Sequence, residues 1–197
     1  MIVMQPGAAK RAAARLLVAI LCLLAPGAAM AGVEIGFYSR EMGANNYPHA
    51  FVHVEGALDD GTIVDDTYGF TARSVTPAIL FGSVGGEVVA ESDAYVAKST
   101  RHFTLALSDL EYRQAMAVVE AWRSKRQPSY NLGRANCIHF VAEIAEALGL
   151  EAEVPKSLTR KPRSFLQHVK AENEAEIATR SVLVPAPLAE PAWPLLE

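Results

Sequence analysis

The first 31 residues follow the pattern of a secretory signal, and this feature limits what the rest of the chain can fold into. Three basic residues precede the short apolar run 16–24, and Ala29 and Ala31 supply small side chains for a cleavage before Gly32. Removing residues 1–31 leaves 166 of the 197 residues and a single cysteine, Cys137. A chain of this length without an internal disulfide must be held together by one hydrophobic core.

The same segment determines the expected compartment and charge. The apolar run is too short to span a bilayer comfortably, so we expect an exported protein, periplasmic or secreted, with no stable membrane span after signal removal. An uncleaved N-terminal anchor is the alternative. Segment 1–31 holds three basic and no acidic residues, so its loss takes the formal net charge from −4 to −7. This acidic balance disfavours nucleic acid as a partner, and also electrostatic binding to anionic membranes.

Hydrophobic periodicity predicts strands in the first half of the mature chain and helices in the second half. Strands are expected over 33–38, 49–55, 62–65, 87–97 and 101–107, and helices over 109–126, 136–149 and 162–171. This order predicts an α+β fold, with a small antiparallel sheet and helices packed on one side. The expected organisation is a signal peptide over 1–31, one domain over 32–175 and a Pro/Ala-rich tail over 176–197.

Cys137 is the first candidate for chemistry. It lies at the start of the helix predicted over 136–149, where the first-turn N–H groups and the helix dipole favour a thiolate. A free cysteine in an exported protein is a liability unless it is buried or used. A buried cysteine that serves only as a small hydrophobic side chain is the alternative, and the cysteine count alone does not decide between the two.

A nucleophilic thiolate needs a proton carrier, most often histidine. His49 and His53 lie at even spacing on the strand over 49–55 and therefore share one face, so either could meet Cys137. His139 is rejected because two residues on a helix place it on a different face from Cys137. His102 and His168 are expected at the solvated surface.

The imidazole in turn needs a group that fixes its tautomer. Asp65 and Asp66 follow the predicted return strand, and Asp65 is the candidate orienting group for His49. Whether His53 or Asp66 takes the place of His49 or Asp65 stays open at this point. Two solvated carboxylates beside a turn are the alternative.

The segment Asn136-Cys137-Ile138-His139-Phe140-Val141 resembles the Asn-Cys-Glu-His-Phe-Val motif of the lecithin retinol acyltransferase family. That family is similar to a circularly permuted papain-like fold related to NlpC-type cell-wall peptidases. The strand that begins at His49 resembles the family's histidine strand, with His49 matching the base and Asp65 matching the second polar residue. Ile138 replaces the acidic residue of the motif, and the hairpin between His49 and Asp65 is longer than in the family.

The resemblance implies acyl transfer through a Cys137 thioester, with His49 as base, Asp65 as orienting group and no cofactor or metal. Tyr130 and Asn136, which precede the nucleophile, are expected to contact substrate. Outside the cytoplasm the expected substrate is a peptidoglycan peptide amide, and the related alternative is an acyl lipid. A non-catalytic envelope or binding domain that keeps the papain-like scaffold is the rival hypothesis. A metal site at His49, His53 and an aspartate is disfavoured, because that histidine spacing suits a helix better than a strand. The oligomeric state is not predicted.

Overall fold

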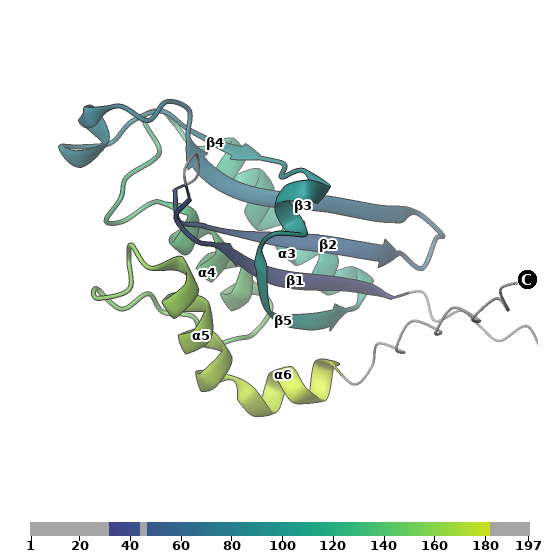
Figure 1. Cartoon of the computed structure of the whole chain (residues 1–197). Helices are drawn as coiled ribbons and strands as arrows, with labels where there is room; N and C mark the ends of the chain where they lie inside the picture. Colours follow the sequence, from purple (N-terminus) through teal and green to yellow (C-terminus); the bar gives the residue numbers. More distant parts are fainter. Residues whose placement is uncertain (1–31, 44–46, 182–197) are drawn as a thin grey trace, which may run out of the picture. The chain divides into compact units, whose positions relative to one another are not determined.

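The computed structural model describes residues 32–43 and 47–181, and its centre is a five-stranded antiparallel sheet in the order β4-β3-β2-β1-β5 (Figure 1). The strands are β1 (Val33–Arg40), β2 (His49–Ala57), β3 (Ile63–Ala72), β4 (Gly86–Val89) and β5 (Thr100–Leu107). β1 and β2 pair along their full length, from Val33 opposite Gly56 to Arg40 opposite His49. His49 therefore lies at one end of the sheet, and the β2–β3 hairpin lies at the other.

Four helices pack on one face of this sheet, so the α+β architecture with helices on one side is confirmed. They are α3 (Asp109–Arg123), α4 (Cys137–Ala147), α5 (Pro162–Glu172) and α6 (Glu174–Ser181). Alternate residues of the central strands enter the core from this face, as a two-residue period requires. Ile35, Phe37, Val52 and Val54 are buried there against α4 and its neighbours, including the fully buried Phe140.

The opposite face of the sheet carries a smaller aromatic layer. Tyr38 and Phe51 stack with ring centroids 5.3 Å apart, and Tyr95 lies 5.7 Å from Phe51. Tyr95 belongs to α2 (Asp93–Val96), a single helical turn that covers this face (Figure 1). The 3₁₀ helix η1 (Pro77–Leu80) lies in the connection between β3 and β4, at the end of the sheet where β2 begins.

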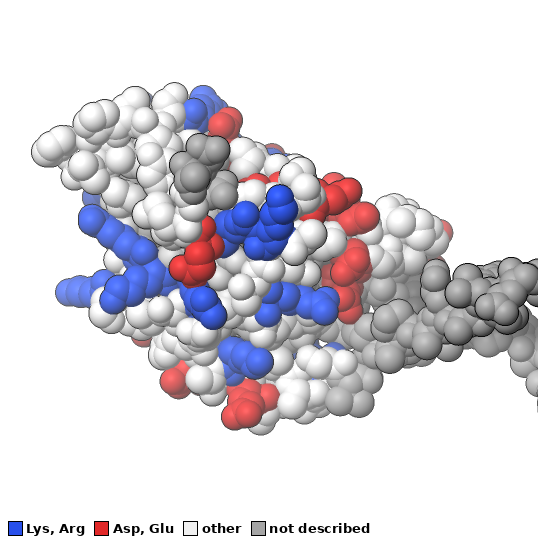
Figure 2. All heavy atoms as spheres, viewed as in Figure 1, with Lys and Arg blue, Asp and Glu red and all other residues white. Residues whose placement is uncertain are grey.

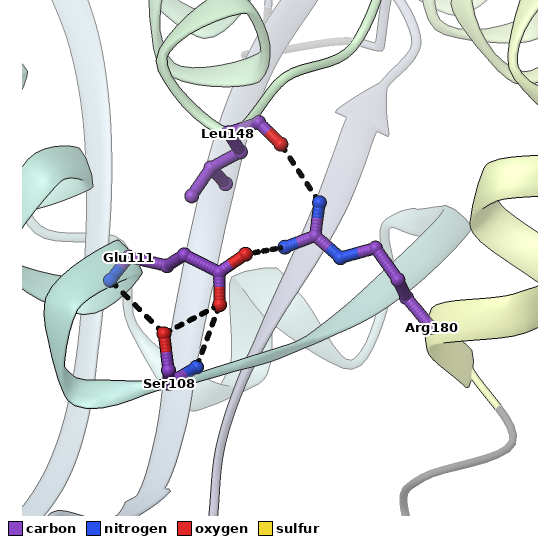
Figure 3. Close-up of polar contacts among 4 residues, drawn as sticks. All are labelled: Ser108, Glu111, Leu148 and Arg180. Atoms are coloured by element: carbon purple, nitrogen blue, oxygen red, sulfur yellow. Dashed lines mark hydrogen bonds and ion pairs between the residues drawn. The ribbon is translucent and has the colours of Figure 1, made fainter.

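A polar network fixes the last helix to the rest of the fold (Figure 3). Ser108 and Glu111 form a capping box at the start of α3, in which Ser108 N–H donates to the Glu111 carboxylate over 2.8 Å. The Arg180 guanidinium of α6 donates to that carboxylate over 2.7 Å and to the backbone oxygen of Leu148 over 2.7 Å. Charge-assisted bonds of this length are among the stronger ones in proteins, so α3, the end of α4 and α6 are held together.

Three predictions about the elements were wrong. β3 runs to Ala72 rather than ending at residue 65, because alternation continues through Tyr68 and Phe70. The strand expected over 87–97 ends at Val89, and a turn of helix follows from Asp93. Residues 176–181, expected to belong to the tail, are part of α6, because Ile177 and Arg180 anchor that helix on the domain. The signal segment 1–31 and residues 182–197 lie outside the described residues.

Candidate active site

Cys137 is the first residue of α4, and the residue before it fixes that helix start. The side-chain oxygen of Asn136 accepts hydrogen bonds from the N–H groups of Ile138, at 2.9 Å, and His139, at 3.3 Å, which is the usual geometry of an N-cap. The amide nitrogen of Asn136 donates to the backbone oxygens of Leu132 and Thr159, at 2.8 and 2.7 Å. Asn136 is buried, and its polar atoms bond to protein groups. We therefore assign it to positioning Cys137. Asn136 also lines the cavity described below, and its predicted contact with substrate stays a prediction.

The cap also determines which first-turn donors stay available. The N–H groups of Ile138 and His139 bond to Asn136, whereas the N–H of Cys137 has no acceptor among the described residues. An unpaired N–H at a helix N-terminus, beside the sulfur, is suited to a developing negative charge.

A cavity of about 430 Å³ brings Cys137 and His49 together at one end of the sheet. Its size lies within the usual range for small-molecule sites. Its lining includes His49, Glu91, Tyr95, Tyr130 and Cys137. Most of the remaining wall is apolar, with Val75, Ile79, Leu80, Val89, Leu132 and Ile138.

His49 is the buried histidine of this cavity, and its environment favours the charged ring. Burial lowers its pKa, but interactions with Cys137 and then with the Glu91 carboxylate outweigh burial and raise the pKa from 6.5 to about 9. Nε2 of His49 lies 3.3 Å from Oε1 of Glu91, and these side chains are only 12% and 15% exposed. Nε2 is shielded from solvent and makes no hydrogen bond to a described residue, so its contact with Glu91 is an ion pair without hydrogen-bond geometry.

Glu91 is the functional candidate that sequence reasoning missed. The chain leaves β4 after Val89, and Thr67 of β3 then holds the backbone of Glu91 through two hydrogen bonds, of 2.6 and 3.1 Å. Ser92 and Asp93 begin α2 directly afterwards, and this Ser-Asp pair is a helix-start signal that argues against a strand over 87–97. The turn brings Glu91 beside the first residue of β2.

Gly69 of β3 allows the close approach of the His49 ring. A side-chain carbon added at this position would overlap Nε2 of His49 and press on Phe51. The imidazole of His49 therefore lies directly against the backbone of β3. This requirement was also not recognised in the sequence.

Asp65 does not lie beside His49, so the predicted orienting role is wrong. The register of β2 and β3 places Asp65 opposite Glu55 and Asp66 opposite Val54, near the hairpin end. Glu55 lies six positions along the strand from His49, which corresponds to roughly 20 Å. Asp65 instead accepts a 2.7 Å hydrogen bond from Nε2 of His53, and its side chain is 76% exposed.

Of the other residues considered in the sequence, Tyr130 lines the cavity and three histidines do not. Burial and then Cys137 raise the pKa of Tyr130, and its ring stacks on Phe70 at 5.7 Å. His139 lies outside this cavity and contacts Asn136, and His168 pairs with Glu172 at the surface. His102 is half-buried rather than solvated, with Nε2 2.8 Å from the hydroxyl of Ser39.

Two properties of the described residues bear on ligands and membranes. Within residues 32–43 and 47–181, no three His, Cys, Asp or Glu side chains converge as a metal site would require. None of the helices in the same ranges combines the length and the hydropathy that crossing a bilayer requires.

No family model matches the sequence, and neither a curated protein nor a solved structure is similar enough to be matched. The residues of the cavity therefore carry the functional conclusion by themselves.

Proposed function

We propose that this protein is an exported thiol hydrolase or acyltransferase of permuted papain-like type, with Cys137 as nucleophile, His49 as proton carrier and Glu91 as the group that orients His49. The observation that carries the proposal is the buried grouping of these three side chains at a helix N-terminus in one cavity. A strongly perturbed histidine beside a specific partner in a cleft is typical of catalytic sites.

The proposed reaction has two steps. The Cys137 thiolate attacks the carbonyl carbon of an amide or ester, the N–H of Cys137 stabilises the oxyanion, and the bond to the leaving group breaks. The His49 imidazolium gives its proton to the departing amine or alcohol, which leaves a thioester on Cys137. Water or another acceptor then attacks the thioester and gives its proton to His49, and the thiolate is regenerated.

Glu91 replaces Asp65 in this scheme for a physical reason. A carboxylate beside the imidazole stabilises the cation and fixes the ring orientation, and the effect is strong where water is excluded. Glu91 meets both conditions, since it lies 3.3 Å from Nε2 and is nearly buried. Asp65 is exposed and is hydrogen-bonded to His53 instead.

Two substrate classes fit the proposal for different reasons. A peptidoglycan peptide amide follows from the expected compartment. An acyl lipid is favoured by the apolar cavity wall, in which Val75, Ile79 and Leu80 would surround an alkyl chain better than a charged peptide.

The direct experiment compares the wild type with Cys137→Ala on wall-peptide fragments and on acyl lipids. We expect hydrolysis or transfer of one class by the wild type and, in the variant, a loss of at least about 10⁴-fold, since a missing nucleophile leaves only binding and the oxyanion donor. Equal turnover by both proteins would contradict the mechanism. The non-catalytic rival predicts turnover of neither class and an alkylation rate of Cys137 that does not depend on His49.

A further inference from the structure

The end of the molecule that holds the cavity mouth has an unusual surface. Residues 74–86, which cover most of the connection from β3 to β4 and the first residue of β4, contain no charged side chain, and the exposed Arg73 directly precedes them. Within them Val75, Leu80 and Phe81 are 55%, 66% and 87% exposed. Large apolar side chains exposed together, next to a cavity, typically mark an interaction surface. We call residues 74–86 the apolar lip.

A basic segment reaches the same cavity from another part of the chain. Between Glu153 and Glu172 the sequence has five basic and no acidic residues, and all five are exposed: Lys156, Arg160, Lys161, Arg163 and Lys170. Arg160 lines the cavity together with Val75 and Leu80 of the apolar lip. Figure 2 shows the uncharged lobe at the upper left and Lys and Arg side chains gathered below it at the same end.

The positions of the charged residues bear on the expectation drawn from net charge. The sequence prediction disfavoured anionic membranes because the mature chain carries a formal charge of −7. In the structure one group of acidic residues lies away from the cavity, although Glu91 and Glu41, which directly follows β1, lie at the cavity end. The acidic residues Glu55, Asp59, Asp60, Asp65 and Asp66 belong to the β2–β3 hairpin at the other end of the sheet from His49. A surface potential depends on this distribution rather than on the total.

We infer that the apolar lip and the basic segment together dock on the surface of an anionic lipid bilayer, with the cavity mouth facing the membrane. Exposed Leu and Phe side chains gain free energy by entering the headgroup boundary, and flanking Lys and Arg side chains are attracted to anionic headgroups. The combination on one end, around one opening, matches a peripheral membrane contact. A wall polymer would account for the basic residues but not for the exposed Phe81.

The test measures co-sedimentation of the chain from residue 32 onward, without the expected signal segment, with vesicles. The Cys137→Ala background is used throughout, so binding is read without turnover and is independent of the proposed chemistry. We expect binding to mixed phosphatidylglycerol–phosphatidylcholine vesicles that weakens as salt is raised, and weaker binding to phosphatidylcholine alone.

Two pairs of variants separate the contributions. Leu80→Asp with Phe81→Asp is expected to weaken binding to both vesicle types by roughly tenfold or more. Arg160→Glu with Lys161→Glu is expected to weaken binding to the anionic vesicles by a similar factor and to leave the neutral vesicles unaffected. These side chains are exposed, so the fold should survive, and circular dichroism checks this.

Matched controls lie elsewhere on the molecule. Ile63 and Leu110 are 75% and 60% exposed, and Arg113 is 65% exposed, yet none lines the cavity. Ile63→Asp with Leu110→Asp, and Arg113→Glu, are expected to leave vesicle binding unchanged. The inference is overturned if the parent protein binds neither vesicle, if the controls lose as much as the lip and basic variants, or if it binds isolated cell-wall sacculi and no vesicles.

Discussion

His49 and His53 lie four residues apart on β2, and each is paired with a carboxylate. The two pairs differ in solvent exposure, in hydrogen bonding and in their distance from Cys137. His53 and Asp65 form a 2.7 Å hydrogen bond at the surface, where Asp65 is 76% exposed. His49 and Glu91 lie 3.3 Å apart, both nearly buried, and His49 also interacts with Cys137, the only cysteine in residues 32–197. The shorter bond is the less significant one, because water screens an exposed pair and its net contribution is about 0–1 kcal/mol.

The difference shows that burial, rather than bond length, distinguishes a candidate catalytic pair from a surface pair. Nε2 of His49 is shielded and without a hydrogen bond to the described residues, whereas Nε2 of His53 is satisfied. Native structures rarely leave a buried polar atom unpaired, and a catalytic role is one of the explanations for such an exception. The network of Ser108, Glu111 and Arg180 follows the opposite rule, with several bonds around one carboxylate, and we assign it to stability alone.

The largest effect is expected when the two histidines are replaced in turn. His49→Asn should lower kcat/KM on the substrate class that the wild type turns over by roughly 10²–10⁴-fold, because the thiolate loses its proton carrier. His53→Asn is the matched control on the same strand and should leave kcat/KM unchanged. Steady-state kinetics of both variants check this, and equal losses would remove the distinction between the pairs.

A smaller effect is expected from the two carboxylates. Glu91→Gln keeps the shape of the side chain but removes the charge beside His49, and we expect kcat to fall by about 10–10³-fold with little change in KM. Asp65→Asn should have no such effect. If Asp65→Asn lowers kcat and Glu91→Gln does not, the original assignment of Asp65 is restored and the geometry of the cavity is misleading.

The smallest effect concerns stability against pH. The pKa of His49 is raised from 6.5 to about 9, since Cys137 and Glu91 outweigh burial. A group whose pKa is raised in the folded state contributes stability that is complete below about pH 6.5 and is lost as pH rises through about 9. The free energy of unfolding of the wild type should therefore decline over this interval relative to His49→Asn.

Chemical denaturation at a series of pH values measures that decline. His53→Asn is again the control, and it should lose stability across the interval as the wild type does. A decline that is identical in the wild type and in His49→Asn would show that His49 does not carry the charge assigned to it.

The sequence predicted the two residues that local patterns can reveal. Cys137 is recognisable because it is the single cysteine of residues 32–197 and lies at a helix start, and His49 because it begins an alternating strand. Glu91 was missed because its position depends on a tertiary contact with Thr67 and on the end of β4, which no local period reports. Asp65 was misassigned because the return strand was expected to end at residue 65. The strand runs on to Ala72, so Asp65 lies opposite Glu55 near the turn, whereas Gly69 lies opposite Phe51, closer to His49.

The surface properties show the same limit. The formal charge of −7 is a sum over residues 32–197, and it conceals the basic residues between Glu153 and Glu172 because acidic residues outnumber basic ones over that range as a whole. The exposure of Phe81 is likewise a property of the fold, since the sequence of the apolar lip resembles that of a core segment.

The central claim, that His49 serves a reactive Cys137 thiolate, is tested most directly by the rate of alkylation of Cys137 with iodoacetamide as a function of pH. Our account predicts fast labelling well below about pH 8 in the wild type and in His53→Asn, and slow labelling there in His49→Asn. Labelling that becomes fast only above about pH 8.5 in all three proteins, as for an ordinary thiol, would contradict it.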